Sequence, residues 1–239
     1  MKKLFCLAAV FAVLLGATPA AAAESISVVE LFTSQGCSSC PPADKVLRQL
    51  SKRRDVIALA HHVDYWNYIG WEDPFSSKEA SARQRRYARI LSNWSPYTPQ
   101  VVVDGRHDVA GFKRSAILQR ISNSLQEGDV QVLKVEHSSD GSESRVMLPP
   151  LRDGYVMWRI DYDRRHETEV ERGENAGRSL INANVVRDMA QISDSDRALG
   201  EVIIDKDSLQ AQGRGGAVVL VQQGRVGPII AAGHVRVTP

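Results

Sequence analysis

Cys37 and Cys40 form a CxxC pair whose setting limits the possible folds more than any other feature of the chain. The pair follows a strand-like run, residues 27–32, and precedes a helix-like run, residues 44–50. Two cysteines at a helix N-terminus can close a small disulfide, and the free N–H groups and the helix dipole there stabilise a thiolate on the first sulfur. The pattern therefore predicts thiol–disulfide exchange, with Cys37 as nucleophile and Cys40 as the cysteine that resolves a mixed disulfide.

Two other uses of the pair stay open from the residues alone. A purely structural disulfide is disfavoured, because such a bridge gains most by closing a long loop and a two-residue gap closes almost none. A structural zinc site needs four ligands, and the sequence contains no second pair of cysteines. The metal hypothesis that stays open is a site in which a histidine completes the two cysteine ligands.

The first 23 residues have the pattern of a secretory signal peptide. Lys2 and Lys3 precede an apolar run at residues 4–15, and a stretch of small residues ends at Ala23. We expect cleavage near Ala23 and a periplasmic or secreted product. No later apolar stretch reaches the length of a membrane helix, so we do not expect the product to be embedded in a membrane.

Loss of this segment would change both the cysteine count and the charge. Cys6 would leave with the signal, so the CxxC pair would hold the only two of the 3 cysteines that stay. In an oxidising compartment no other residue could then form an internal disulfide with it. The 30 Lys and Arg residues would fall by two and equal the 28 Asp and Glu residues. A nearly neutral chain argues against nucleic acid as a partner.

Residues 24–128 carry the pattern of an α/β unit. A continuous apolar strand at residues 55–63 follows the first helix, and a β-hairpin and an amphipathic helix close the unit near Gly128. An aromatic and helical insertion at about residues 64–95 interrupts this order. The arginines of the insertion are expected on a solvated helix face; they are Arg83, Arg85, Arg86 and Arg89.

Residues 129–239 show a different pattern. Short alternating strands, for example residues 155–161 and 217–221, are separated by turn residues. This favours a mostly antiparallel β domain, either sandwich-like or barrel-like. The predicted architecture is therefore an α/β domain followed by a β domain, with the boundary at residue 128.

The order of strand, CxxC pair, helix, strand, Thr98-Pro99, hairpin and closing helix resembles the thioredoxin-like superfamily over residues 26–127. The resemblance implies that the N-terminal α/β domain is thioredoxin-like. In that superfamily the proline is cis and lies against the CxxC pair, and the residue before it pairs with a bound peptide. Substrate-binding roles for Thr98 and Pro99 follow from the resemblance.

More narrowly, the chain is similar to a secreted family catalogued as domain of unknown function 1223. The shared segments are Glu30–Pro42, His62–Trp66, Gly70-Trp71, Asp73–Phe75 and Arg172–Asn175. This similarity spans nearly the whole mature chain. The family name carries no function, so it supports the fold far more than the reaction.

Several residues near the pair are candidates for supporting roles. Glu30 lies near the place where thioredoxins hold a buried acid, and the resemblance implies that it shuttles the proton of Cys40. His61, His62 and Asp64 end the second predicted strand, on the side of an open sheet where sites form. A histidine there would lower the pKa of a thiol or act as acid or base; otherwise it satisfies a hydrogen bond in the loop.

Three further candidates belong to the motif itself. Ser38 and Ser39 either hydrogen-bond a thiolate or cap the helix, and the sequence favours neither role. Pro41 falls in the first helical turn, where a missing N–H group costs little, so it fixes the start of the helix.

Together these features predict exchange with protein thiols or disulfides, without a cofactor or a resident metal. The direction, whether oxidation, reduction or isomerisation, does not follow from the residues. One alternative is a protein that handles a soft metal ion such as Cu(I) through both thiolates and His61 or His62. The other is a binding module whose CxxC pair is not catalytic.

Overall fold

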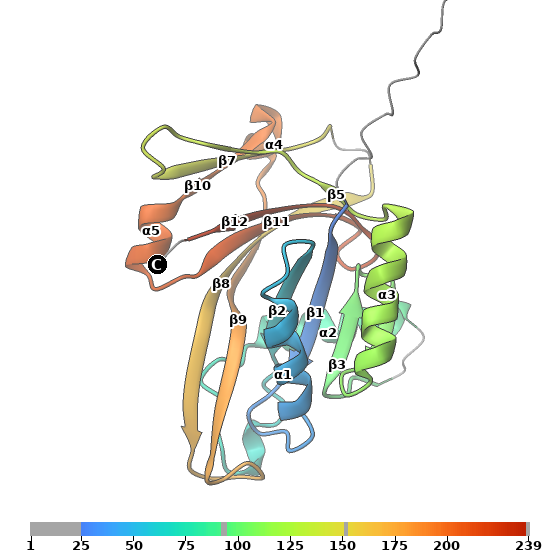
Figure 1. The fold of residues 1–239 in the computed structure, drawn as a ribbon, viewed down its shortest axis with the longest axis vertical. Coiled ribbons are helices and arrows are strands. Elements are labelled where there is room, and N and C mark those ends of the chain that lie inside the picture. The colour runs from blue at the N-terminus through green and yellow to red at the C-terminus, as the bar shows by residue number, and fades with distance from the viewer. Residues whose placement is uncertain (1–24, 92–94, 151–152, 238–239) are drawn as a thin grey trace, which may run out of the picture.

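The computed structural model describes residues 25–91, 95–150 and 153–237 (Figure 1). The predicted signal peptide, residues 1–23 with Cys6, lies outside the described residues. The first half of the chain contains β1 (Ser27–Thr33), α1 (Pro41–Leu50), β2 (Val56–His62), the short 3-10 helix η1 (Asn67–Ile69), α2 (Lys78–Ile90), β3 (Gln100–Val103), β4 (His107–Ala110) and α3 (Arg114–Glu127). The second half contains β5 (Gln131–Val132), β6 (Val135–His137), β7 (Glu143–Met147), β8 (Tyr155–Val170), β9 (Arg178–Gln191), α4 (Asp194–Leu199), β10 (Glu201–Asp205), α5 (Lys206–Ala211), β11 (Gly216–Gln223) and β12 (Ile229–Arg236).

Nine strands form one mixed sheet in the order β4-β3-β1-β2-β9-β8-β11-β12-β5, and β10-β7-β6 form a small second sheet. β1 pairs in parallel with β2 and antiparallel with β3. The two halves of the chain join where β2 meets β9, through parallel pairing of Ala60 with Val185. The long antiparallel ribbon of β8 and β9 then carries the sheet onward to β11.

The expected fold class, a thioredoxin-like α/β domain followed by a separate β domain, is wrong. The protein is mostly β, and strands from both sides of residue 128 share the nine-stranded sheet. The physical reason lies at the edge of β2, which would otherwise present unpaired backbone groups. β9 covers this edge at Val185, and Asn184 Nδ2 donates to Ala58 O at 2.8 Å.

The predicted boundary falls in the connection between α3 and β5. α3 ends at Glu127, and Gly128 follows with a left-handed φ of 67°. Glycine suits this position because it adopts a positive φ without strain. The division into two folding units stays a prediction, although the sheet runs through both segments.

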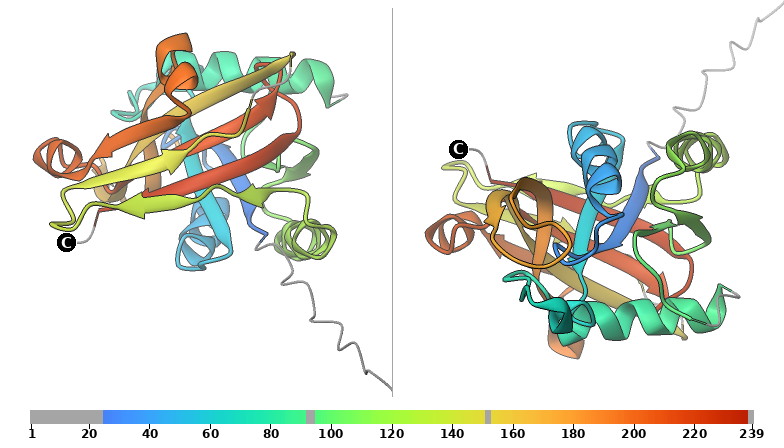
Figure 2. Two further views of the ribbon diagram at one scale, coloured as in Figure 1. Left: turned by 90° about the horizontal axis from the view of Figure 1, so that it is seen from above. Right: turned by 90° about the horizontal axis from the view of Figure 1, so that it is seen from below.

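The central strands are covered on both faces (Figure 2). α1 and α3 pack on one face, where Leu31 of β1 joins their apolar core. On the other face Val28 packs in a cluster with Trp158 of β8. α2 lies on this second face as well, and its Tyr87 packs against Phe32. Alternate side chains of β1 therefore face different layers, and all seven of its residues are buried.

The small sheet packs over β11 and β12. Val146 of β7, Ile204 of β10 and Val219 of β11 belong to one apolar core between the two sheets. Gly233 of β12 permits this close approach, because a Cβ there would come within 2.7 Å of Val146 Cγ1.

The helix ends follow local chemistry. Pro41 and Pro42 occupy the first turn of α1, and Ser77 caps α2 by accepting a hydrogen bond from Ala80 N at 3.0 Å. The expected solvated arginine face on α2 is wrong for Arg83, which is fully buried. None of the described helices is long and apolar enough to cross a membrane.

Candidate functional site

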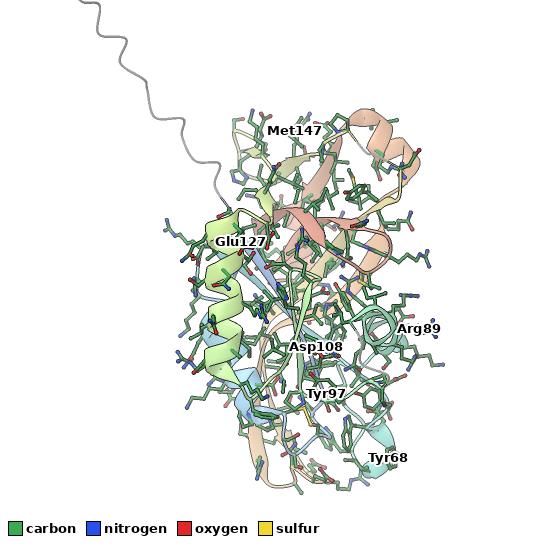
Figure 3. All side chains as sticks on the ribbon, turned by 90° about the vertical axis from the view of Figure 1, so that its right-hand side faces the viewer. Tyr68, Arg89, Tyr97, Asp108, Glu127 and Met147 are labelled. Atoms are coloured by element: carbon green, nitrogen blue, oxygen red, sulfur yellow. A yellow bond between two sulfur atoms is a disulfide. The ribbon has the colours of Figure 1, made fainter. Side chains whose placement is uncertain are left out.

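Cys37 and Cys40 are joined in a disulfide at the start of α1 (Figure 3, yellow). Their Cα atoms are 5.4 Å apart. The chain turns sharply after β1, since Cys37 N donates to Ser34 O at 3.1 Å and Cys40 N donates to Cys37 O at 3.2 Å. Cys40 is the N-cap residue of α1, and Pro41 follows it. The predicted position of the pair at a helix N-terminus is confirmed.

The hydroxyl of Ser39 lies beside the first sulfur. Ser39 Oγ is 3.3 Å from Cys37 Sγ, and a disulfide sulfur carries no hydrogen, so the serine donates. Ser38 and Ser39 are both exposed, whereas Cys37 and Cys40 are only 1% and 0% exposed. The serines are therefore the part of the motif that faces solvent, and the sulfur atoms lie beneath the surface.

The disulfide is covered by the turn between β8 and β9, residues 171–177, which we call the cap turn. Asn175 is buried in it, and its Nδ2 donates to Gln35 O at 2.8 Å and to Cys37 O at 2.9 Å. The carboxylate of Glu174 accepts a hydrogen bond from Ser38 N at 3.3 Å. Residues about 140 positions apart in the sequence therefore close over the sulfur pair.

Gln35 holds the loop before the disulfide to the rest of the molecule. Its backbone N donates to Asp73 Oδ2 at 2.8 Å. Its side-chain Nε2 donates to Thr168 Oγ1 and Asn182 Oδ1, each at 3.1 Å, on the ribbon of β8 and β9. Its Oε1 accepts from Trp71 Nε1 at 3.1 Å. A single buried amide thus ties the CxxC loop to both covering segments.

A buried group of titratable side chains lies on the α1 side of the sheet. His62 Nδ1 is 2.7 Å from Asp73 Oδ2, and both side chains are buried. Burial alone would neutralise both groups, but their mutual attraction outweighs it: the pKa of His62 is raised and that of Asp73 is lowered. Asp44 is buried in the first turn of α1, and desolvation raises its pKa to about 6, against the pull of His62.

Glu30 lies on the opposite face of the sheet, away from the sulfur atoms. Arg83 holds it through two contacts, Nε to Oε1 at 2.6 Å and Nη2 to Oε2 at 2.9 Å. Tyr87 OH donates to Oε2 at 2.6 Å, and His61 Nε2 is 2.9 Å from Oε1. Burial would raise the pKa of Glu30, but Arg83 and His61 hold it far below its usual range. The structure does not bring Glu30 or His61 together with the disulfide.

Adjacent strand residues point to opposite faces, which separates His61 from His62. The His61 side chain lies on the α2 side of the sheet, where it stacks on Phe32 with ring centroids 5.1 Å apart. Asp64 lies beyond the strand, and its Oδ1 accepts from Ser81 Oγ of α2 at 2.5 Å. Of the three candidates that end this strand, only His62 joins the buried group below the CxxC pair.

Thr98 and Pro99 lie close to the first turn of α1, and the bond between them is cis. A Cβ on Gly111 would come within 2.8 Å of Pro99 Cβ and 2.9 Å of Ala43 Cβ, so the proline and the helix meet at this glycine. Thr98 Oγ1 accepts from Trp66 Nε1 at 2.8 Å. Their role in substrate binding stays a prediction.

Metal ligation was one alternative for the pair. Within residues 25–91, 95–150 and 153–237, no group of three or more His, Cys, Asp or Glu side chains is arranged to hold a metal ion. His62 Nδ1 faces Asp73, and His61 Nε2 faces Glu30. Each imidazole therefore has one ring nitrogen engaged by a carboxylate.

The family model described as "Protein of unknown function (DUF1223)" matches residues 28–222. The chain belongs to the DUF1223 family. The family similarity expected from the CxxC segment, from the segments between His62 and Phe75 and from Arg172–Asn175 is therefore confirmed. A search of curated proteins gave no match.

Two solved structures are similar to this DUF1223 protein. Protein AGR_C_4864 from Agrobacterium tumefaciens shares 31% sequence identity, with a TM-score of 0.72, over 91% of this chain and 97% of that chain. HBP35 of Porphyromonas gingivalis shares 14% identity, with a TM-score of 0.59, over 90% of this chain and 76% of that chain. The second likeness concerns the fold alone.

Sequence reasoning about this DUF1223 member missed four residues around the pair. Asp44 carried a signal, because it falls four residues after Cys40 and so shares its face of α1. Gln35, Asp73 and Asn175 all lie in segments that the chain shares with the family, but that similarity assigns them no role. The importance of Gln35 and Asn175 comes from contacts between distant segments.

Proposed function

We propose that this protein exchanges disulfides with protein substrates through Cys37 and Cys40, in the periplasm or outside the cell. One observation carries the proposal: the disulfide lies at the N-terminus of α1, with Asp44 buried one turn below it on the same helix. The helix N-terminus would stabilise the thiolate of reduced Cys37. A carboxyl group with a pKa of about 6 is able to take or give a proton near neutral pH.

The reaction balances as two thiol–disulfide exchanges. When the protein acts as oxidant, a substrate thiolate attacks Cys37 Sγ, the bond between the two sulfur atoms breaks, and Cys40 leaves as a thiolate that takes up a proton. A second substrate thiolate then attacks the mixed disulfide and Cys37 leaves. The substrate gains a disulfide and the CxxC pair becomes a dithiol; the reverse sequence reduces a substrate.

Asp44 is the proposed proton partner of Cys40 in place of Glu30. The guanidinium of Arg83 fixes Glu30 as a carboxylate on the other face of the sheet. Asp44 N donates to Cys40 O at 3.1 Å, which places the two residues on adjacent turns of one helix. An inner cysteine that leaves or attacks needs a group that exchanges its proton without bulk water.

Access to Cys37 requires the cap turn to move. The exposed serines give a partner a surface to approach, but Asn175 and Glu174 hold the backbone over the sulfur. Thr98 and Pro99, beside the first turn of α1, are the proposed contacts of an extended substrate segment. A partner would then replace the hydrogen bonds of the cap turn with its own.

The test is insulin reduction with dithiothreitol, together with refolding of a scrambled disulfide protein. Cys37→Ala should abolish both activities. Cys40→Ala should accumulate mixed disulfides with substrate, visible by mass, because the resolving thiol is absent. Lys45→Gln, an exposed change on α1 outside the motif, should keep activity.

A parent protein inactive in both assays would overturn the proposal. In that case Cu(I) titration of the reduced protein decides between the alternatives. Stoichiometric binding that is lost in Cys37→Ala and in His62→Ala would assign the pair to soft-metal handling. N-terminal sequencing of the protein recovered from the secreted or periplasmic fraction tests the expected cleavage near Ala23.

A further inference from the structure

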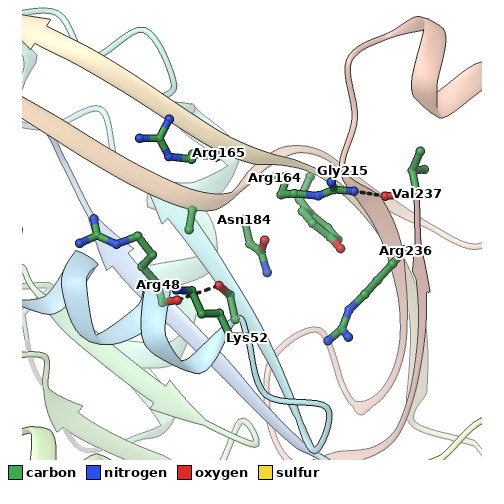
Figure 4. A pocket seen from close by; sticks show the side chains of 11 residues that line it. Arg48, Lys52, Arg164, Arg165, Asn184, Gly215, Arg236 and Val237 are labelled. Carbon is green, nitrogen blue, oxygen red and sulfur yellow. Dashed lines mark hydrogen bonds between the residues drawn. The ribbon is translucent and has the colours of Figure 1, made fainter. Parts of the chain in front are cut away.

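A second site lies at the far end of α1 from the disulfide. A cavity of about 640 Å³ opens between the last turns of α1 and strands β8, β9 and β12 (Figure 4). Five of the side chains that line it are basic, and we call it the basic pocket. They are Arg48, Lys52, Arg164, Arg165 and Arg236.

The pocket exists because the large sheet opens at this place. β2 and β9 pair only at Ala60 and Val185. The next residue back along β9, Asn184, has a positive φ of 47° and turns its amide to Ala58 O. β9 therefore diverges from β2, and α1 spans the gap. Gly215 forms part of the wall, where a Cβ would come within 2.6 Å of Arg164 Cβ.

The charge of the pocket is not compensated. No acidic residue lines it. Arg48 Nη1 donates to Ile181 O at 3.4 Å, Arg236 Nη2 donates to Arg53 O at 3.1 Å, and Arg164 Nη2 donates to Val237 O. These carbonyl oxygens bring no negative charge. In the described part of the chain, Arg165 is the only one of the five with an ion pair, to the exposed Glu167 at 2.6 Å.

Four unpaired cations around one concavity repel one another, and a bound anion removes that repulsion. Elsewhere on the same ribbon the protein does neutralise its arginines: Asp163 contacts both Arg187 and Arg214. The guanidinium fork matches the geometry of phosphate and carboxylate oxygens. The contrast between these neutralised arginines and the basic pocket indicates a ligand site at the pocket.

The arrangement of the charged groups specifies the kind of anion. In Figure 4 the guanidinium groups of Arg48 and Arg236 point to different sides of Asn184, which lies between them. Arg48 is held at Ile181 O and Arg236 at Arg53 O, so their guanidinium groups are anchored at separate places. The cavity volume falls in the range of small-molecule sites. We infer that the basic pocket binds a small organic molecule with two or more separated oxyanion groups, independently of the disulfide.

Isothermal titration at constant ionic strength tests this inference. The probes are fructose 1,6-bisphosphate for phosphate groups and citrate for carboxylate groups, with fructose 6-phosphate as the single-phosphate control. We expect one of the first two to bind with a Kd below about 1 mM, and fructose 6-phosphate to bind at least about tenfold more weakly than the bisphosphate. The better probe should also raise the thermal midpoint.

Variants on one helix locate the binding. Arg48→Gln and Lys52→Gln should each weaken the better probe about tenfold, whereas Lys45→Gln, exposed on α1 outside the pocket, should leave it unchanged. Lys52 is exposed, so Lys52→Gln keeps the fold and the test stays valid even where Arg48→Gln does not fold. Cys37→Ala should bind the probe normally, which separates this inference from the proposed exchange activity.

Three outcomes would overturn the inference. The first is no binding of either probe at 10 mM. The second is equal weakening by Lys45→Gln and Lys52→Gln, which would indicate general charge attraction. The third is binding only to a single-stranded 20-nucleotide DNA or to phosphatidylglycerol vesicles, which would assign the surface to a macromolecular polyanion or a membrane.

Discussion

At the scale of single residues, Glu30 and Asp44 are both buried, on opposite faces of one sheet, and their pKa values shift in opposite directions. Glu30 meets the bidentate guanidinium of Arg83 and the hydroxyl of Tyr87, so its charged form is satisfied at every oxygen. Asp44 meets mainly desolvation, and the attraction of His62 compensates only part of it. Burial therefore keeps Asp44 close to its neutral form at a pH where Glu30 is fully ionised.

This difference predicts a pH-dependent stability at Asp44. Its pKa is raised from 3.8 to about 6 in the folded protein. The contribution of Asp44 to the free energy of unfolding is therefore fully present below about pH 4 and is lost as pH rises through 6. A pKa change of this size corresponds to about 3 kcal/mol of unfolding free energy. We expect Asp44→Asn to be more stable than the parent at pH 8 by up to about 3 kcal/mol, with no difference near pH 4. Urea unfolding across this pH range measures it.

The same substitution should also slow exchange, because asparagine cannot carry a proton to or from Cys40. Glu127→Gln, an exposed change on α3, serves as the control for both measurements. A stability gain that is equal at pH 4 and pH 8 would show that Asp44 is not the titrating group.

The pair of Glu30 and Arg83 makes the opposite prediction. Arg83→Met leaves a buried carboxylate without its partner and should cost about 3–5 kcal/mol of unfolding free energy at pH 7. Because the pKa of Glu30 is lowered, its contribution is present above its unfolded pKa and is lost as pH falls. Arg89→Met, exposed on the same helix, should change stability by less than about 0.5 kcal/mol. Equal losses in urea unfolding would refute a special role for Arg83.

Among the secondary-structure elements, the ribbon of β8 and β9 has the widest influence on the site. The strands contain 16 and 14 residues, longer than common strands. Their paired length carries the cap turn to the CxxC loop, where Asn175 satisfies two backbone carbonyls at once. Access to the sulfur atoms is therefore set by an element from the far half of the chain.

Loosening this element should increase the reactivity of the disulfide. Asn175→Ala leaves Gln35 O and Cys37 O without their donor, a loss of about 1–3 kcal/mol for each buried group. We expect the second-order rate constant for disulfide reduction by dithiothreitol to rise at least about tenfold. Lowering the free energy of opening the cap turn by about 1.4 kcal/mol is enough for this change. Glu171→Ala, exposed in the same turn, should leave the rate unchanged. Samples quenched in acid, alkylated and weighed by mass spectrometry report the rate, and an unchanged rate in Asn175→Ala would show that the turn does not limit access.

Among the individual elements, the sequence pattern predicts local secondary structure well, but it predicts poorly which elements and side chains contact one another. Alternating apolar residues locate β8, β10 and β11, and the CxxC spacing locates the disulfide and the start of α1. The pattern does not show that β8 continues to Val170, because its outer half alternates charged residues as any exposed strand does. Nor does it show that Arg83 turns inward, because only the three-dimensional position of Glu30 gives that arginine a partner. These failures share one cause, which is that the deciding contacts join segments distant in sequence.

Over the whole molecule, the two halves of the chain depend on one another for burial. Ile57 and Leu59 of β2 share an apolar cluster with Ile160 of β8 and Leu220 of β11. Arg83 of α2 also donates to Gln222 Oε1 at 3.1 Å. A fragment ending at residue 128 would expose this face of its sheet to water.

We therefore expect the fragment of residues 24–128 to lack a cooperative unfolding transition, whereas the full chain unfolds in one transition. Circular dichroism and calorimetry on the two proteins compare them directly. Mixing the fragment with residues 129–239 should restore part of the transition, because the cluster can then form between chains. A fragment that melts cooperatively by itself would instead support two independent folding units.

The CxxC loop starts directly after β1, whose seven residues are all buried between two paired strands. Amide protons in such a strand exchange with deuterium only when the whole molecule opens, so those of β1 should be among the last to be lost in a hydrogen-exchange experiment. The amide of Ala176 donates to Gly173 O at 3.2 Å within its own exposed turn, so it should exchange once that turn opens, well before the amides of β1. The sulfur pair is thus attached to slowly exchanging backbone. The rate at which the disulfide reacts would then be set by the opening of the cap turn and not by movement of β1.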